Sequence, residues 1–430
     1  MTRGAPALRA FRNRMIDLLR RRSGGDLPVR LVLWDGTAFD FGPAPALVTL
    51  RLASARVFRS FLFGDMGRLG EAYIRGDLLV EGRLQDVLRV GMILAERIGR
   101  SPVARRAASI AARLPRRRRK TADAAAISYH YDVSNAFYAL WLDREMIYSC
   151  ALFQTGDEDI DTAQANKLDH ICRKLRLQPG DTLLDIGCGW GGLLCWAARR
   201  YGVRGVGVTL SRQQYEFARQ RAEAEGLAAQ IEIRLQDYRD IPGEAVFDKV
   251  VSVGMYEHVG IANLPRYFAS VTRLLKPGGA FLNHGISVGD PDGPAQGPPG
   301  GEFIDRFVFP GGELPHASRA FHLMSRAGLE IVDFEDLRPH YPPTLIAWAR
   351  RLEARQDEAI ATAGVERFRI WRMYMAGMAV AFDRGWLRVG QMLAFKPMPP
   401  GMAPRPWTRA YQYDGQDAPP LTGLLEWGDL

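Results

Sequence analysis

A carboxylate followed by a glycine-rich turn is the strongest chemical feature of this sequence. An apolar run through Leu183 and Leu184 leads to Asp185 and is typical of a buried parallel strand, and the segment 187–192 after it is Gly-Cys-Gly-Trp-Gly-Gly. Glycines let the backbone turn sharply and approach a ligand closely, so we expect a ligand-binding loop and a helix that starts at Trp190. The spacing departs from the Gly-x-Gly-x-x-Gly fingerprint of dinucleotide-binding proteins, and the Gly-Lys-Ser/Thr of a P-loop is missing. Taken alone, the segment also fits a tight structural turn.

Alternating strands and helices must position this loop. Helices are expected at 213–224 and 264–275, and they separate strands in the order of a doubly wound α/β sheet. The predicted strands are 182–186, 205–210, 231–235, 249–253 and 280–284. Ligands bind such sheets beyond the carboxyl ends of the strands. The polar motifs expected at those ends are Asp185, residues 209–211, Asp237 with Tyr238, Glu257 with His258, and His284.

Helical and irregular segments flank the predicted sheet. Aromatic residues between 129 and 151 suggest a cap over a pocket, and the Gly- and Pro-rich segment 288–315 predicts a lid or substrate loop. Helices at 343–363 and 365–385 and a last strand at 388–395 are expected to follow. We therefore divide the chain into 1–98, an α+β module with β-hairpins in 29–52 and a helix in 69–77; 99–126, a basic linker; 127–397, the α/β domain; and 398–430, an irregular tail.

Positive charge is concentrated in the first part of the chain. The 430 residues have a formal charge of +9, but residues 1–121 hold 25 Arg or Lys against 10 Asp or Glu, a net of +15, so the remainder sums to −6. This asymmetry predicts an anionic partner, either nucleic acid or an acidic membrane. The alternative is that the charged residues form an ordinary solvent-exposed surface. The apolar stripe in 8–19, surrounded by arginines, fits a helix that lies on an anionic bilayer, or an ordinary surface helix. The basic run 116–120 lacks the aromatic residues that stack on bases, which favours lipid headgroups or a plain linker over nucleic acid.

Composition also bears on the cellular compartment. The four cysteines are Cys150, Cys172, Cys188 and Cys195. Since they have no paired metal-ligand spacing, we expect free thiols in a reducing cytoplasm and no metal site. Residues 1–26 lack the apolar stretch of a secretory signal, and 373–382 is too short to span a bilayer, which needs about 20 residues. We therefore expect a soluble, cytoplasmic protein that associates peripherally with the inner face of the membrane.

Several motifs taken together resemble one family. Asp185 with its glycine loop resembles motif I of the S-adenosylmethionine (SAM) methyltransferases, and the chain as a whole is similar to the cyclopropane-fatty-acid synthases and the related mycolic acid methyltransferases. The matching segments, which cover about residues 127–397, are His130-Tyr131-Asp132, Tyr148-Ser149-Cys150-Ala151, 184–192, 207–211, 236–239, 251–260, 309–312 and Tyr341. A weaker similarity, centred on 69–73, extends to the N-terminal domain of the bacterial phospholipid enzymes.

The resemblance implies a Rossmann-like SAM methyltransferase sheet with a helical cap. SAM would lie along the glycine loop, with Tyr148 and Ser149 at its methionine end, residues 209–214 at its ribose, and Asp237 and Tyr238 beside its adenine. The implied cofactor-binding residues are Tyr148, Ser149, Asp185, Gly187, Cys188, Gly189, Gly191, Thr209, Leu210, Gln214, Asp237 and Tyr238. A carboxylate that often holds the ribose of SAM in other methyltransferases is missing here, so Thr209, Ser211 and Gln214 would take that role.

The resemblance also implies a second small ligand. An alkene is a weak nucleophile that must be pressed against the methyl group of SAM, and the product is a carbocation that must be kept from water until a proton leaves. Family members are understood to use a bound bicarbonate ion as the base. The implied catalytic residues are Cys150, Glu257, His284, Ile286 and Tyr341, with Cys150 and Ile286 acting through backbone groups. Taken singly, Glu257 also fits a helix-start carboxylate, and His284 a structural histidine.

Two departures from the family pattern concern the product. Met378 stands where a cysteine has been assigned as a nucleophile; a thioether cannot act so, and we expect Met378 to line the acyl channel. Gly285 is expected to leave extra space near the base. The cation could therefore yield a ring, a methylene branch, or a methylated diene of the kind that precedes furan fatty acids.

Three functions compete at this point. The first is C-methylation of double bonds in unsaturated phospholipid acyl chains, with docking to an anionic membrane; the second is a small-molecule N-methyltransferase; the third is a nucleic-acid protein. The set Glu257, His284 and Tyr341 favours the first function, and the missing aromatic residues in 116–120 argue against the third. The chain length, the double-bond position and the oligomeric state, a homodimer included, stay open.

Overall fold

The computed structural model describes the chain in several stretches. These are residues 27–42, 45–63, 66–83, 134–292, 301–309, 312–398 and 406–413, with single positions between 16 and 93. The amphipathic segment 8–19 is largely outside these residues, and the basic linker 99–126 and the motif His130-Tyr131-Asp132 are entirely so. The domain boundaries proposed from the sequence near 98 and 126 therefore stay predictions.

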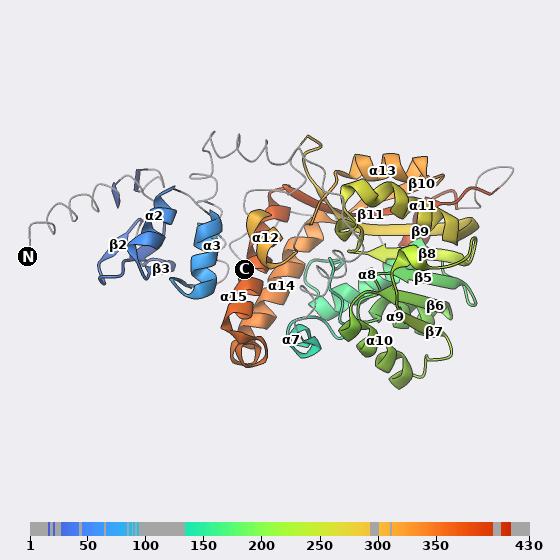
Figure 1. Ribbon diagram of the computed structural model, residues 1–430, viewed down its shortest axis with the longest axis horizontal. Coiled ribbons are helices and arrows are strands. Elements are labelled where there is room, and N and C mark those ends of the chain that lie inside the picture. The colour runs from blue at the N-terminus through green and yellow to red at the C-terminus, as the bar shows by residue number, and fades with distance from the viewer. Residues whose placement is uncertain are drawn as a thin grey trace, which may run out of the picture.

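A seven-stranded sheet forms the centre of the molecule (Figure 1). Its order is β10-β11-β9-β8-β5-β6-β7, and the five strands from β9 to β7 run parallel. The strands are β5 Thr182–Ile186, β6 Arg204–Thr209, β7 Ile231–Leu235, β8 Phe247–Val253, β9 Leu275–Val288, β10 Glu330–Asp336 and β11 Leu387–Phe395. Strand β11 runs antiparallel between β9 and β10. The α/β class and the doubly wound sheet are confirmed. Five strands, β5, β6, β7, β8 and β11, lie within two residues of their predicted places, and β10 was not predicted.

Strand β9 is much longer than predicted. The segment 276–279, expected to end a helix, belongs to β9, and β9 continues four residues past His284 to Val288. The extension follows from the antiparallel pairing with β11, in which Leu387 lies opposite Val288. His284 is therefore in the body of a strand and not at its end. A partner more than 100 residues away in sequence leaves no local pattern that would reveal the extension.

Two groups of helices cover the two faces of this sheet. The first comprises α8 Ile160–Lys174, α9 Gly192–Tyr201 and α10 Arg212–Ala224, and the second comprises α11 Leu264–Leu274 and α13 Ala317–Arg326. Ile171 of α8 and Leu194 of α9 belong to one apolar core, whereas Phe268 of α11 and Met324 of α13 belong to another. Because apolar side chains alternate between the two faces of a strand, both cores form on one sheet. Helix α9 starts at Gly192, two residues later than predicted.

A helical cap packs on one end of the sheet. It consists of α7 Asn135–Ala139, α12 Gly301–Phe307, α14 Tyr341–Ala354 and α15 Gln356–Asp383. The helix expected at 343–363 is wrong as a single element, since it ends at Ala354 and a new helix starts after Arg355. The predicted break near residue 364 is real, because Gly364 has φ 83° and interrupts α15. The segment 288–315, expected to be a loop, contains α12.

The N-terminal part forms a smaller sheet with two helices. Its elements are β1 Val29–Val32, β2 Ala38–Asp40, β3 Val48–Leu52, α2 Ala55–Phe63, α3 Met66–Arg75 and β4 Leu78–Glu81. Strands β1 and β2 form the expected hairpin, but β3 pairs parallel to β1, so the prediction of successive hairpins is wrong there. In the described part of the chain no helix is long and apolar enough to cross a bilayer, and no cluster of three or more His, Cys, Asp or Glu could hold a metal.

Helix α3 joins this module to the cap. Arg306 of α12 pairs with Glu71, and Arg372 of α15 donates to the hydroxyl of Tyr73 over 3.1 Å. Gly70 lies so close to α12 that an added Cβ would be 3.0 Å from the ring of Phe303. The two parts of the described chain are therefore packed against each other and not merely linked.

A buried ion-pair cluster fastens α8 to the edge of the sheet. Lys174, whose side chain is fully buried, pairs with Glu335 of β10, and the Nε2 of His170 lies 2.7 Å from Glu335 Oε2. Burial alone would raise the pKa of Glu335, but the hydrogen bond from His170 and the charge of Lys174 outweigh it and hold the pKa well below its ordinary range. The backbone oxygen of Gln412 lies 3.1 Å from Nδ1 of His170, so the segment 406–413 is held by the same cluster.

We expect Glu335→Gln to lower the free energy of unfolding at pH 7 by about 3 kcal/mol, because it removes the nearer charge partner of the buried Lys174 and leaves only Asp333, 3.7 Å away. The folded-state pKa is depressed below the unfolded value of about 4.3, so this stabilisation is complete above that pH and is lost as the pH falls below it. Urea unfolding at pH 7 and pH 4 should therefore show a smaller difference between variant and parent at pH 4. Glu232→Gln, which breaks an exposed ion pair with Arg234, is the control and should cost no more than about 0.5 kcal/mol. Equal costs for the two variants would contradict the assignment.

Candidate functional site

The glycine loop connects β5 to α9 in a conformation that requires glycine. Gly187 and Gly191 have φ of 85° and 79°, and a Cβ on Gly187 would lie 2.9 Å from Met255 Cγ. The amides of Gly187 and Cys188 both donate to the carbonyl of Val208 on β6, so these residues shape the loop. Gly191 is the N-cap of α9 and has no side chain that could accept a hydrogen bond. The backbone amides of the first turn are therefore available to donate to a ligand.

Asp185, one residue before the end of β5, has one carboxylate oxygen without a partner in the described residues. Its side chain is buried, and no group in the described part of the chain hydrogen-bonds to Oδ1. Burial raises the pKa of Asp185 to about 7, and the charge of Lys167 acts against this rise. A buried carboxylate oxygen without a donor costs free energy, so the site fits a ligand with an ammonium group, such as the amino acid end of SAM.

Lys167 is a buried residue that the sequence reasoning missed. It lies on α8, is 1% exposed, and its Nζ donates to Ser149 Oγ over 2.8 Å. Burial lowers its pKa to about 8, although Asp143 and other neighbours raise it. The available signal was its spacing: Lys167 is four residues after Ala163 and four before Ile171, on the apolar stripe of the helix.

The predicted ribose-binding side chains form one connected group. Thr209 Oγ1 donates to Gln214 Oε1 over 2.9 Å, and Ser211 caps α10 by accepting from the amide of Gln214. Leu210 connects β6 to this cap. These hydroxyl and amide groups can hydrogen-bond to sugar hydroxyls.

Asp237 and Tyr238 follow β7 at the same edge of the sheet. The carboxylate of Asp237 accepts from Arg239 Nε over 2.8 Å and pairs with the guanidinium, so its charge is already compensated. The ring of Tyr238 stands edge-on to that of Tyr267, with centroids 5.4 Å apart. Asp237 and Tyr238 therefore offer one polar and one aromatic surface, which together suit an adenine ring.

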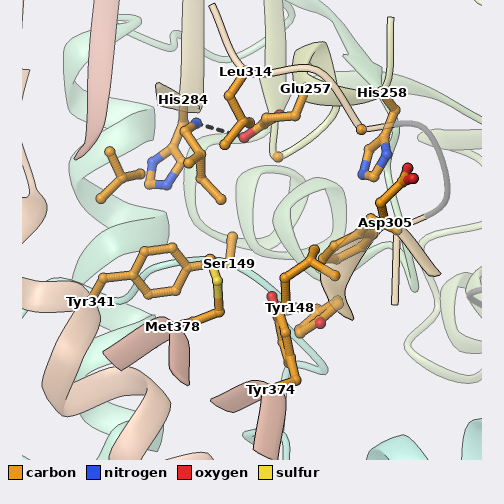
Figure 2. A pocket seen from close by; sticks show the side chains of 16 residues that line it. Tyr148, Ser149, Glu257, His258, His284, Asp305, Leu314, Tyr341, Tyr374 and Met378 are labelled. Carbon is orange, nitrogen blue, oxygen red and sulfur yellow. Dashed lines mark hydrogen bonds between the residues drawn. The ribbon is translucent and has the colours of Figure 1, made fainter. Parts of the chain in front are cut away.

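A single cavity brings together most of the predicted catalytic residues (Figure 2). The residues that line it are Tyr148, Ser149, Gly254, Glu257, His258, His284, Ile286, Ile304, Asp305, Phe309, Gly312, Leu314, Tyr341, Tyr374, Met378 and Val389. Glu257 and His284 lie on one side, and Tyr341 and Met378 lie across from them. Cys150 does not line this cavity: its thiol is buried, with Sγ 3.7 Å from the carbonyl of Leu337.

Glu257 is held in place from one side only. Its Oε1 accepts from the amide of Ile286 over 2.6 Å, whereas no group in the described residues bonds to Oε2. Burial raises the pKa of Glu257 to about 7, whereas hydrogen bonds from the backbone amides of Glu257 and Ile286 lower it. The amide of Ile286, which the resemblance assigns to the anion, thus orients Glu257.

His284 presents a second polar atom without a protein partner. Its Nδ1 lies 3.3 Å from Nε2 of Gln391, which is directly opposite in β11, and within the described chain its own Nε2 has no partner. Burial lowers the pKa of His284 well below its ordinary value, and the charges of Lys167 and Lys174 add to this effect. Burial therefore favours the neutral ring, and a Gln391 amide that donates to Nδ1 would put the ring proton on Nε2.

Aromatic rings form the opposite wall. Tyr148 and Tyr374 line the cavity, and Trp371 packs against both, with ring centroids 5.7 and 5.5 Å away. Tyr341 packs on Phe382 at 4.4 Å. Ring faces attract positive charge, so this wall is suited to a cation that must be kept dry.

The two departures noted in the sequence have different outcomes. Met378 lines the cavity, as expected. The extra space expected at Gly285 does not exist, because the ring of Tyr256 occupies it and an added Cβ would be 2.0 Å from Cε1. Tyr256 is fixed there by its hydroxyl, which donates to the carbonyl of Ile286 over 2.8 Å.

Comparison with known proteins agrees with this geometry. Residues 118–392 match the family described as "Mycolic acid cyclopropane synthetase", and residues 18–98 match a domain of unknown function. A "Probable fatty acid methyltransferase" of Pseudomonas putida is 47% identical over 391 residues, which cover 90% of this chain and 96% of that protein. The "Cyclopropane-fatty-acyl-phospholipid synthase" of Escherichia coli K12 is 41% identical over 265 residues, covering 61% of this chain and 66% of the relative.

A solved structure shows the same fold. The mycolic acid cyclopropane synthase CmaA1, crystallised with SAH and CTAB, superposes with a TM-score of 0.60 at 33% identity, over 64% of this chain and 98% of that one. The family match, residues 118–392, contains the residues that line the cavity and nearly all of the seven-stranded sheet. The chain therefore belongs to the mycolic acid cyclopropane synthetase family and is a SAM-dependent methyltransferase of the group that forms cyclopropane and methyl-branched fatty acids.

Proposed function

We propose that the protein transfers the methyl group of SAM to a double bond in an unsaturated phospholipid acyl chain and closes a cyclopropane ring, with a bound bicarbonate ion as base. The observation that carries the proposal is a pair of buried atoms without protein partners, Glu257 Oε2 and His284 Nε2, on the wall of an aromatic-lined cavity. The names of the P. putida and E. coli relatives support a fatty acyl or phospholipid substrate.

The residues at the sheet edge are arranged to hold SAM, which supplies an electrophilic methyl group. Asp185 would accept from its α-ammonium group, and the free amides at the start of α9 would bind its carboxylate. Tyr148 and Ser149 line both this end and the cavity, so they would direct the sulfonium into the cavity. Thr209 with Gln214 would hold the ribose, and Leu210, Asp237 and Tyr238 would flank the adenine.

The pair Glu257 and His284 fits bicarbonate in its hydrogen-bonding pattern. An ionised Glu257 needs a donor at Oε2, and the Nε2–H of His284 needs an acceptor; bicarbonate offers one hydroxyl and two further oxygens. Bound bicarbonate would accept the proton from the new methyl group, and a carboxylate that accepts its hydroxyl makes it a stronger base. Tyr341 would contact it from across the cavity, and Ile286, whose amide donates to Glu257, would flank it. Cys150, which the resemblance also assigns to this ion, does not line the cavity and is given no contact with it.

The cavity also suits the two steps on the acyl chain. First the π electrons of the alkene form a bond to the methyl carbon while the carbon–sulfur bond breaks, which leaves a cation on the acyl chain. Then a C–H pair of the new methyl group closes the ring while the proton passes to the base. Tyr148, Tyr374 and Trp371 would stabilise the cation and exclude water, and Met378 would contact the chain.

The same cation can lose a proton from another carbon. That loss would give a methylene branch, a methyl branch after reduction, or a methylated diene. The P. putida relative is named a probable fatty acid methyltransferase, which supports these branched or diene products as the alternative to a ring. The ring remains our first choice because the family description and the names of the E. coli relative and of CmaA1 all refer to cyclopropane synthesis.

We further propose that the protein works in the cytoplasm on the inner face of the membrane. The support is the excess of positive charge in residues 1–121, a net of 25 − 10 = +15, which would attract anionic lipid. A homodimer is compatible with this arrangement but is not required by it.

With SAM and liposomes of monounsaturated phospholipid, we expect the purified protein to add 14 mass units to the acyl chains, as measured by lipid mass spectrometry. Proton NMR of the product then separates a ring from a methylene branch. Liposomes of fully saturated phospholipid are the control and should gain nothing. Methyl transfer to amines without transfer to lipid would contradict the proposed function.

Glu257→Gln should lower kcat at least about 100-fold, because an amide cannot support a base as a carboxylate does, and should change the Kd for SAM by no more than about twofold. Glu313→Gln is the matched control: Glu313 also accepts one backbone amide, that of Ile261, but does not line the cavity. It should keep parental kcat. Parallel losses of turnover and SAM binding in Glu257→Gln would argue against its role at the base.

Reversing the charge of Arg116 to Arg119 with glutamates should weaken binding to anionic vesicles at least tenfold at low salt, measured by co-sedimentation. Raising the salt to about 0.5 M should shrink the difference, because surface charges are screened. Reversal of Arg219, an exposed residue of the α/β part, together with the half-buried Arg234 is the control with no expected effect. Unchanged sedimentation of the first variant would refute docking through the basic run.

A further inference from the structure

One buried lysine beside the cavity has no role in the mechanism above. Lys167 is 1% exposed, and its Nζ donates to the hydroxyl of Ser149, which lines the cavity. Burying an ammonium group costs free energy unless negative charge is close, and a neutral hydroxyl does not compensate that cost. The compensation must come from the buried carboxyls near it.

Two buried carboxyls interact with Lys167, and they differ in how they are satisfied. Asp143 accepts from the amides of Glu145 and Ile147, over 2.8 and 2.9 Å. Asp185, by contrast, has an Oδ1 with no partner in the described residues. Both carboxyls are at most 3% exposed. The group therefore contains one position, at Asp185, where a donor from a ligand would complete the hydrogen bonding.

The charges of this group do not balance without a ligand. With Lys167 charged and Asp143 and Asp185 ionised, the sum is −1. Burial opposes that state and raises the pKa of Asp143 to about 6 and that of Asp185 to about 7, so near neutral pH part of the population keeps a proton on a carboxyl. A ligand ammonium at Asp185 would bring the sum to zero with both carboxyls ionised.

The other ionisable groups around the cluster are uncharged. Burial raises the pKa of the Cys150 and Cys188 thiols and of the Tyr267 phenol above the ordinary value; the charge of Lys167 acts weakly on Cys150, and that of Asp185 on Cys188 and Tyr267. His284 feels the charge of Lys167 and is neutral. Lys167, Asp143 and Asp185 are therefore the groups whose charges matter.

We propose that Lys167 is a positioning residue for the amino acid end of SAM: it orients Ser149 and holds Asp185 ready for the α-ammonium group, and ligand binding expels a proton from the cluster. The inference deepens the proposed function, on which it rests for the identity of the ligand. In the binding step the carboxyl of Asp185 loses its proton to solvent and accepts a hydrogen bond from the ligand ammonium, so charge and protons balance.

The test uses S-adenosylhomocysteine (SAH), which has the same amino acid end as SAM but no methyl group to transfer. Titration calorimetry of the full-length protein at pH 6.5, in two buffers of different ionisation enthalpy, gives the number of protons released. We expect between about 0.5 and 1 proton at pH 6.5 and fewer at pH 8, where Asp185 is already ionised in the free protein and only the charged fraction of Lys167 could still release a proton. No release anywhere between pH 6 and pH 8 would overturn the proposal without any variant.

Lys167→Met removes the positive charge at similar length. The Kd for SAH should rise about 10- to 100-fold, and proton release should persist at pH 8, because without the lysine Asp185 keeps its proton to a higher pH. Loss of packing alone would weaken binding but would not move the pH range of proton release. Parental affinity in this variant would overturn the proposal.

Lys174→Met is the matched control, since Lys174 is also fully buried on α8 but pairs with Glu335 at the sheet edge. It should unfold at lower urea and still bind SAH within about twofold, with parental proton release. If Lys167→Met does not fold, Ser149→Ala replaces it, with a smaller rise in Kd expected. Proton release on binding SAH without transfer to lipid would sink the proposed function and leave this inference standing; lipid methylation without proton release would do the reverse.

Discussion

Burial of polar atoms without protein partners is the constraint on which this site depends. Asp185, Glu257 and His284 each have one such atom, and each is on or beside the rim of the seven-stranded sheet. Left unsatisfied, every one of these atoms costs free energy of about 1–3 kcal/mol, so the surrounding structure must be stable enough to bear the sum. That cost becomes binding energy when a ligand supplies the missing donor or acceptor. The same desolvation raises the pKa of both carboxyls to about 7 and keeps the imidazole neutral.

Two structural features make this possible. The long pairing of β9 with β11 places His284 opposite Gln391, so the histidine is oriented from within the sheet and not from a loop. The helical cap contributes the aromatic wall and, with Tyr341 at the start of α14, closes the cavity on the side away from the sheet. Strands and helices thus hold His284, Tyr341 and Tyr374, while Glu257 lies on the short 3-10 turn Tyr256–His258 and Tyr148 lies in the irregular segment before α8.

The sequence predicted the parts of this arrangement that have local signals. The glycine loop, the parallel strands and the residues that follow them were recognisable because apolar runs and glycines mark them directly. The length of β9, the parallel pairing of β3 and the break at Arg355 were not, since each depends on contacts between distant segments. Lys167 and Gln391 escaped notice for a related reason: a buried polar residue looks like any other polar residue until the fold shows what surrounds it. Gly285 was misread because the ring of Tyr256, which fills its space, comes from another element.

Helix α12 is shared by two parts of the molecule. Phe303 and Arg306 contact α3 of the N-terminal module, while the intervening Ile304 and Asp305 line the cavity. The short helix α12 therefore lies between the N-terminal module and the cavity. A substitution on the side of α12 that contacts α3 can therefore shift residues that line the cavity, so replacing either part by the equivalent piece of a relative would require new contacts at this helix.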